Sequence, residues 1–148
     1  MFKTNLDYAL DQAKRGRTVF PVHYVLKDGN CSCGNTGCQN KGKHPMTPKG
    51  FKDATIDEQQ IRAWWSQYPE ANIGMATGQV SGLIVLDIDP RHGGDESLKY
   101  LISEHDPLPI TYKVKTGGGG EHYYFKRPDK GLKCKNGMLP GVDIKADG

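Results

Sequence analysis

Residues 82–90 constrain the fold of this 148-residue chain more than any other segment. Four consecutive aliphatic residues follow Gly82, too few for a helix, and turn residues bound them, so the segment is predicted to be a buried β-strand. Alternate side chains of a strand share a face, so Asp87 and Asp89 are expected to project the same way, about 6.6 Å apart along the chain. Paired carboxylates repel each other, and a divalent cation would offset that cost. The segment alone leaves open a metal site and a solvated strand end.

A polar segment of residues 28–46 contains three cysteines and a histidine at the spacing Cys-x-Cys-x₄-Cys-x₅-His. The segment has almost no apolar residues by which a core could hold it, and clustered cysteines in a reducing compartment favour a metal over disulfides. A structural Zn²⁺ site would supply the missing order, and the alternative is free thiols in a flexible loop. The predicted zinc ligands are Cys31, Cys33, Cys38 and His44.

The chain has no apolar run of membrane-spanning length, and its N-terminus lacks the basic and apolar segments of a signal peptide. We therefore expect a cytoplasmic protein with no membrane partner. The net charge of +3 is too small to establish nucleic-acid binding by itself.

Helical spacing of apolar residues predicts three helices. The first covers about residues 5–15 and begins with a capping box at Thr4. The second follows a capping box formed by Thr55 and Glu58, and the third ends near His105. They are expected to flank the strands.

Two adjacent tryptophans in the second predicted helix have two interpretations. Exposed aromatic side chains stack nucleic-acid bases. The spacing of Ile61 and Trp64 instead favours packing of these two side chains in the core.

Alternating or short apolar runs predict the strands, and residues 83–89 are expected to pair back on residues 72–78. The other predicted strands are residues 18–22, a hairpin of residues 111–116 and 121–127, and residues 142–145.

Four glycines, residues 117–120, separate the two strands of the predicted hairpin, and His122 follows them. Bare glycine backbone lets phosphates approach closely, so Gly118, Gly119 and Gly120 are candidate nucleotide contacts together with His122. A structural role for His122 is the alternative. The spacing matches neither a dinucleotide-binding fingerprint nor a P-loop.

Four basic side chains are further candidates for phosphate contacts. Lys145 follows Asp143 on the last predicted strand, Lys49 and Lys52 lie in a basic turn, and Arg91 directly follows the paired acids. Arg91 has the alternative role of a simple counter-charge for those acids.

Three carboxylates from two predicted strands, Asp87, Asp89 and Asp143, suit a two-metal centre with His122 nearby. Two cations in such a centre activate an attacking hydroxyl and stabilise a departing pyrophosphate, which is the chemistry of nucleotidyl transfer.

Several motifs along the chain occur together and in a fixed order. They are Gly-Phe-Lys-Asp-Ala-Thr (50–55), Trp-Trp (64–65), Asn-Ile-Gly-Met-Ala-Thr-Gly (72–78), Leu-Asp-Ile-Asp-Pro-Arg-His-Gly-Gly (86–94), residues 116–122, and Gly-Val-Asp-Ile-Lys (141–145). From about residue 9 to residue 148, this set resembles the bifunctional DNA primase/polymerase domain of the archaeo-eukaryotic primase superfamily. The cysteine-containing segment is also similar to an insertion found in many members.

The resemblance implies an α+β fold, in which helices flank a mixed or antiparallel β-sheet of the RNA-recognition-like type and residues 28–46 form a small zinc-binding insertion. It implies one catalytic domain over residues 1–148, in the N-terminal part of a longer prokaryotic, phage, prophage or plasmid replication protein with a fused or associated helicase. The implied activity is primase and polymerase synthesis on a DNA template or primer from nucleoside triphosphates. Asp87, Asp89 and Asp143 would hold Mg²⁺ or Mn²⁺, and His122 would contact the nucleotide.

Two rival functions use the same residues. A metal-dependent phosphohydrolase or nuclease is one, although Pro90 and Arg91 stand where haloacid-dehalogenase-type phosphatases normally have Gly-Thr. A non-catalytic, zinc-containing nucleic-acid-binding module is the other.

Overall fold

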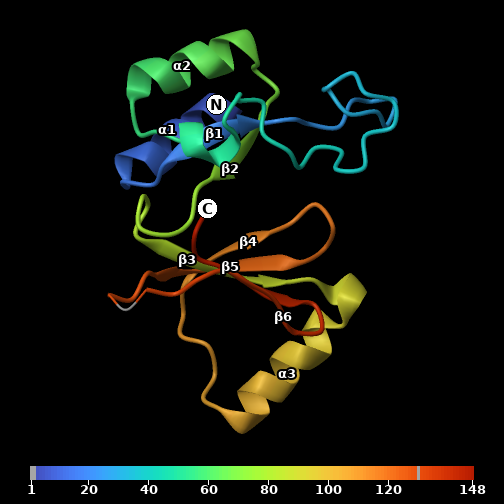
Figure 1. The fold of residues 1–148 in the computed structure, drawn as a ribbon, viewed down its shortest axis with the longest axis vertical. Coiled ribbons are helices and arrows are strands. Elements are labelled where there is room, and N and C mark those ends of the chain that lie inside the picture. Colours follow the sequence, from blue (N-terminus) through green and yellow to red (C-terminus); the bar gives the residue numbers. More distant parts are fainter. Residues whose placement is uncertain (1–2, 130) are drawn as a thin grey trace. The chain divides into compact units, whose positions relative to one another are not determined.

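The computed structural model describes residues 3–129 and 131–148 and has an α+β architecture (Figure 1). The chain divides into two compact units, Met1–Ala76 and Thr77–Gly148, and each is described by itself. Every strand pairing described is antiparallel, which confirms the expected α+β class with antiparallel sheet.

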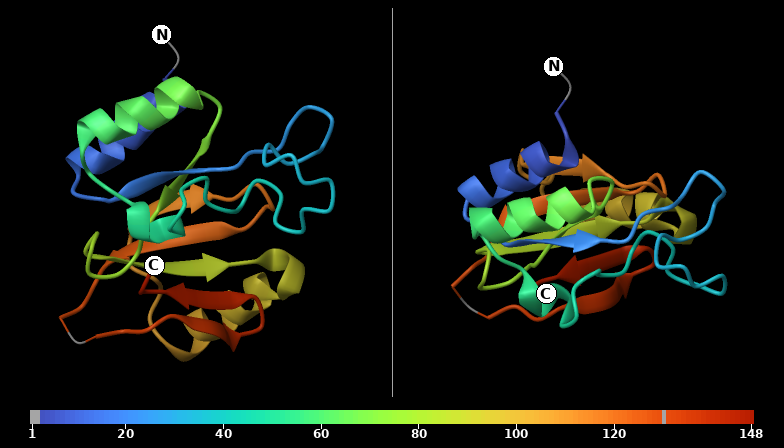
Figure 2. Two further views of the ribbon diagram at one scale, coloured as in Figure 1. Left: turned by 45° about the horizontal axis from the view of Figure 1, so that its top comes forward. Right: turned by 90° about the horizontal axis from the view of Figure 1, so that it is seen from above.

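The first unit packs two helices against a two-stranded sheet. Its elements in chain order are α1 (Asn5–Lys14), β1 (Val19–Val22), the short 3₁₀-helix η1 (Gly50–Asp53), α2 (Glu58–Gln67) and β2 (Asn72–Met75). β1 pairs with β2, and α1 and α2 run side by side (Figure 2). The core between them consists of Ala9, Leu10, Ala13, Val19, Ile61, Trp65 and Ala71.

The helix starts of this unit confirm one prediction and correct another. Thr4 caps α1 in the expected capping box. The cap of α2 is Asp57, whose carboxylate accepts the Gln59 N–H, while Thr55 accepts the Asp57 N–H one step earlier. The predicted box was wrong because the helix begins later than expected, and Asp57 rather than Thr55 is the residue whose side chain caps it.

The assignment of Trp64 to the core is confirmed only in part. Trp65 is 2% exposed, lies in the core cluster and donates its indole N–H to Ala71 O. Trp64 is only partly buried and packs at the margin of the cluster. Both positions fit helical spacing within one residue, so the pattern could not separate them, whereas Ile61 is fully buried as expected.

The second unit is a five-stranded antiparallel sheet with one long helix beside it (Figure 1). Its order across the sheet is β4-β5-β3-β7-β6, and α3 contacts β3 and β7. The elements are β3 (Leu83–Ile88), the 3₁₀-helix η2 (Pro90–His92), α3 (Gly94–Glu104), β4 (Tyr112–Lys115), β5 (Glu121–Lys126), β6 (Lys135–Leu139) and β7 (Val142–Lys145).

The expected pairing of residues 83–89 with residues 72–78 is wrong. A single bridge between Gly78 and Leu83 closes the turn, after which β3 pairs with β5 on one side and β7 on the other. The backbone N–H and C=O groups of a central strand need hydrogen-bonding partners at both edges, and the later strands β5 and β7 supply them.

Candidate functional site

The candidate active site lies on β3, the central strand of the five-stranded sheet. Asp87 pairs in register with His122 on β5 and with Asp143 on β7. Side chains directly opposite one another in a sheet point to the same face, so the three form a row across it. The opposite face is apolar, with Ile88 and Val142 almost fully buried.

Each of the two acids in this row has a basic side chain close to its carboxylate. His122 Nε2 lies 3.3 Å from Asp87 Oδ1, and Lys145 Nζ lies 2.8 Å from Asp143 Oδ2. Burial raises the pKa of Asp143, but the Lys145 ammonium and the Gly137 N–H outweigh it and lower that pKa overall. Lys145 is thus a partner of an acid in the row.

Asp89 stands just beyond the strand and caps η2. Its carboxylate accepts hydrogen bonds from the Arg91 guanidinium at 2.8 and 3.0 Å, and His92 Nδ1 lies 3.0 Å from it. These contacts, the Arg91 bonds foremost, hold the pKa of Asp89 well below its usual range against the opposing effect of burial. Arg91 therefore has the counter-charge role in this structure.

Two glycines fix the backbone of Asp89. The Asp89 N–H donates to Gly141 O at 2.8 Å, and the Gly94 N–H donates to Asp89 O at 2.9 Å. A Cβ on Gly94 would lie 2.6 Å from Gly141 O and 2.7 Å from Asp89 O, which real side chains do not tolerate. The sequence analysis assigned no role to these two glycines. The only indication of their role was that they lie close in sequence to Asp89 and Asp143.

The glycine loop turns tightly between β4 and β5. The Thr116 N–H donates to Gly120 O, and the Gly119 N–H donates to Thr116 O. The loop packs on the Arg91 guanidinium, because a Cβ on Gly118 would lie 2.9 Å from Arg91 Cζ. The structure thus brings Gly118, Gly119 and Gly120 to the end of the strand that carries His122. Lys52 lies in the first unit, on η1, at an exposed position.

The three carboxylates and the cysteine segment differ in how tightly they are gathered. Within the described residues, one group of three or more potential metal ligands has all its ligand atoms within 4.8 Å of one another: Cys31, Cys33, Cys38 and His44. The three acids belong to no such group among the described residues, and each instead has a basic side chain as its neighbour: Arg91 for Asp89, His122 for Asp87 and Lys145 for Asp143.

The cysteine cluster has the geometry of a closed tetrahedral site. His44 Nε2 lies 3.5 Å from both Cys31 Sγ and Cys38 Sγ. A tetrahedral zinc ion with bonds of about 2.3 Å to sulfur and about 2.0 Å to nitrogen places such atoms about 3.5 Å apart. Cys31, Cys38 and His44 therefore have the spacing of ligands to a zinc ion, and the Cys33 Sγ lies within 4.8 Å of their ligand atoms.

Electrostatics favour the metal-binding form of Cys31. Burial raises the pKa of its thiol, but hydrogen bonds from the backbone N–H groups of Cys33 and Gly42 and from His44 outweigh burial and lower it to about 6. Thiolates are the form that binds metals, so this thiol is prepared for an ion.

The cluster is anchored to the first sheet through neighbours that the sequence did not single out. The His23 ring packs on the His44 ring at 4.4 Å, and its Nδ1 lies 2.8 Å from Ser32 Oγ. The His23 N–H donates to His44 O, and Asn72 donates to the carbonyls of His23 and Gly42. The segment is thus tied to β1 and β2.

The family model for the N-terminal domain of bifunctional DNA primase/polymerases matches residues 9–148. The chain belongs to this primase/polymerase family. Its match spans both compact units and includes the acid row, the glycine loop and the cysteine cluster, so the resemblance noted from the motifs is confirmed. A search of curated proteins found no match.

Membership of the primase/polymerase family indicates nucleotidyl transfer with DNA and nucleotide substrates and divalent metal ions. Among the residues that the structure describes, no helix is long and apolar enough to cross a membrane.

Proposed function

We propose that this domain synthesises primers or DNA on a template from nucleoside triphosphates, with Asp87, Asp89 and Asp143 as ligands of two Mg²⁺ or Mn²⁺ ions. The proposal is supported above all by the in-register position of Asp87 opposite Asp143. Like charges directly opposite in a sheet destabilise it. Carboxylate oxygens are the donors that these hard cations prefer, and a bound cation would remove the repulsion.

The side chains around the acids suit a triphosphate substrate. When bound, two cations would activate a 3′-hydroxyl and stabilise the departing pyrophosphate. His122 would contact the nucleotide, and the backbone of Gly118, Gly119 and Gly120 lets phosphates approach closely. On substrate binding, the Arg91 guanidinium would leave the Asp89 carboxylate and bind a phosphate of the substrate instead. Its planar shape suits both groups equally. Lys145 and Lys52 are the weaker candidates for phosphate contacts.

Extension of a labelled primer on a template in the presence of Mn²⁺ tests the proposal. The double substitution Asp87→Ala with Asp89→Ala should abolish extension while thermal unfolding stays cooperative. Asp106→Asn, which removes an exposed acid outside the site, should extend normally. Full extension by the double variant would exclude these metal ligands. Strand shortening or phosphate release without extension would indicate a nuclease or phosphohydrolase instead.

A second experiment separates the two proposed roles of Arg91. Arg91→Ala frees Asp89 from its ion pair, so Mn²⁺ should bind severalfold more tightly in the absence of nucleotide. The KM for the triphosphate should rise, since a phosphate contact is lost. Tighter Mn²⁺ binding by Arg91→Ala with an unchanged KM for the triphosphate would limit Arg91 to the counter-charge role.

We further propose that the cysteine cluster holds a structural zinc ion. The five-stranded sheet with α3 beside it agrees with the RNA-recognition-like type, which we keep as part of the proposal. A helicase, fused or associated, is the proposed partner in replication, because primers are needed where a duplex is opened.

A further inference from the structure

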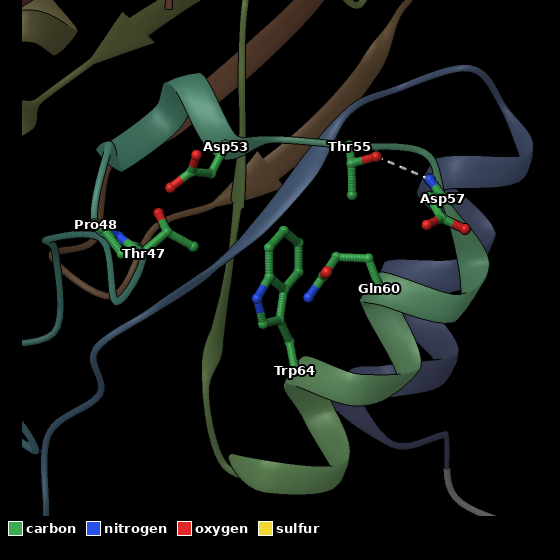
Figure 3. Close-up of a pocket in the computed structure, with 7 residues that line it drawn as sticks. All are labelled: Thr47, Pro48, Asp53, Thr55, Asp57, Gln60 and Trp64. Atoms are coloured by element: carbon green, nitrogen blue, oxygen red, sulfur yellow. Dashed lines mark hydrogen bonds between the residues drawn. The ribbon is translucent and has the colours of Figure 1, made fainter.

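The first unit has a hollow of about 490 Å³ beside α2 that the proposed chemistry does not use. Its lining comes from α2 and from the segment before it (Figure 3). The lining residues are Thr47, Pro48, Asp53, Thr55, Asp57, Gln60 and Trp64.

Trp64 gives the hollow an aromatic wall. The indole packs on the core at its margin, and the Gln60 amide lies beside it in Figure 3. Trp65, its neighbour in sequence, is buried and its indole N–H donates to Ala71 O. Trp65 therefore belongs to the core, whereas Trp64 is available at the hollow. A half-exposed indole at a hollow offers a surface on which a flat ring can stack.

The polar groups of the lining retain unused hydrogen-bonding capacity. Asp53 accepts the Lys49 N–H through Oδ2, and Asp57 accepts the Gln59 N–H through Oδ1. Within the described part of the chain, the other oxygen of each carboxylate, the Gln60 amide and the Trp64 indole N–H have no hydrogen-bond partner. The hollow therefore presents acceptors and donors around an aromatic face.

We propose that this hollow is a nucleobase-binding pocket in which the base stacks on Trp64 and presents N–H donors to Asp53. A guanidinium or ammonium group would suit the carboxylates but has no acceptor for the Gln60 amide or the indole N–H, whereas a base edge carries donors and acceptors together. Phosphate is disfavoured inside by the two carboxylates. Exposed Lys49 and Lys52, adjacent in sequence to Pro48 and Asp53, can meet the phosphates outside.

The chemistry of the lining also predicts which base binds best. Guanine offers two neighbouring N–H donors to one carboxylate, whereas thymine offers one N–H flanked by carbonyl oxygens that the carboxylate repels. The pocket should therefore prefer guanine to thymine. The base can belong to a single strand, which under the proposed function would be the template, or to a free nucleotide.

Equilibrium binding in buffer without Mg²⁺ or Mn²⁺, and without a chelator that would remove the proposed zinc, tests the pocket independently of the proposed catalytic metals. The probes are an oligothymidylate, the same oligonucleotide with one central guanine, and guanosine monophosphate, all at one salt concentration because phosphate contacts depend on salt. Tryptophan emission and the anisotropy of a labelled oligonucleotide are the readouts. The guanine oligonucleotide should quench the emission and bind about tenfold more tightly than oligothymidylate.

Three variants identify the groups responsible. Trp64→Leu keeps an apolar side chain on the core margin and should lose the quenching and about tenfold in affinity, whereas Trp64→Phe keeps a ring and should bind nearly as wild type. Asp53→Asn should erase the preference for guanine while stacking persists. Gln67→Ala, an exposed change at the far end of α2, is the matched control and should bind as wild type.

The outcomes separate the sources of the base and the rival ligand. Tighter binding of the oligonucleotide than of guanosine monophosphate assigns the pocket to a strand, and equal binding assigns it to a free nucleotide. Unchanged affinity in both Trp64→Leu and Asp53→Asn would overturn the proposal, as would quenching by an arginine-rich peptide and by none of the nucleic-acid probes. If the protein binds guanine through Trp64 but does not extend a primer, the proposal of the pocket stands and the proposed function is rejected.

Discussion

Asp87 and His122 face each other on neighbouring strands, and the imidazole Nε2 lies 3.3 Å from the carboxylate Oδ1. The contact holds the His122 ring against the central acid of the row and directs it along the face that the row occupies. Both side chains remain about a third exposed, at 34% for His122 and 28% for Asp87. A substrate reaching the acids would therefore meet the imidazole as well.

Replacing His122 tests whether it contacts the nucleotide. His122→Ala should raise the KM for the nucleoside triphosphate about tenfold, because a hydrogen bond to a charged phosphate contributes about 1.5–3 kcal/mol, and should change kcat less. Steady-state primer extension measures both constants. His105→Ala, at an exposed position after α3, should leave both unchanged. A loss confined to kcat would argue for a role in the chemical step.

The backbone arrangement around Asp89 predicts an intolerant glycine. Gly94→Ala should lower the free energy of unfolding by about 1–3 kcal/mol, because its Cβ would force apart the carbonyls of Asp89 and Gly141. Gly117→Ala is the matched control, since its Cβ would meet nothing within 4 Å and its φ is ordinary. Urea unfolding compares the two. Equal stability would mean that the backbone near Asp89 can relax.

Removing the metal from the cysteine cluster should affect the order of the first unit. Purified protein should contain stoichiometric zinc, and Cys31→Ser should abolish it and lower the Tm, since the segment has little else to hold it. Cys134→Ser is the control, because Cys134 lies outside the cluster and is exposed. Elemental analysis and thermal unfolding are the measurements. Full zinc content in Cys31→Ser would remove that residue from the ligand set.

The hairpin that carries the glycine loop should give a measurable dependence of stability on pH. The Lys113 ammonium, 2.8 Å from Glu121, and then the Tyr123 hydroxyl lower the pKa of Glu121. A carboxyl with a lowered pKa stabilises the fold above its unfolded value of about 4.3, and this contribution disappears as pH falls through the lower folded value.

Lys113→Met should therefore slightly reduce the free energy of unfolding near neutral pH, because the pair is partly exposed, and the difference from wild type should vanish in acid below the folded pKa. Urea unfolding over a pH series measures it. Lys99→Met, which breaks a pair with Glu96 that is far more exposed, should show a smaller effect. A difference that persists in acid would point to lost packing of the lysine stem instead.

Local features of the fold were readable from the sequence. A short apolar run with flanking turn residues located β3, and a Thr–Asp capping box located the start of α1. The spacing of Cys31 to His44 indicated a cluster whose ligand atoms do gather in the structure. Each of these depends on residues close together in the chain, where periodicity and capping act directly.

Long-range features were not readable in the same way. The neighbours of β3 depend on which edges fit together, and nothing in residues 83–88 specifies β5 and β7 over β2. β6 escaped prediction because Lys135, Asn136 and Gly137 are exposed at the edge of the sheet and show no apolar alternation. The contacts of Asp89 with Arg91 and His92 depend on η2, a turn of 3₁₀-helix that its short sequence did not reveal.

The central position of β3 has a consequence for how the protein is made. β3 leaves the ribosome before both of the strands that flank it, and Asp143 belongs to β7, the last strand of the sheet. The cysteine cluster closes from one short segment and needs only β1 and β2 to anchor it, so it can form on a nascent chain well before that point. The row of Asp87, His122 and Asp143 is therefore completed last, and a partly synthesised domain cannot yet place Asp143 opposite Asp87.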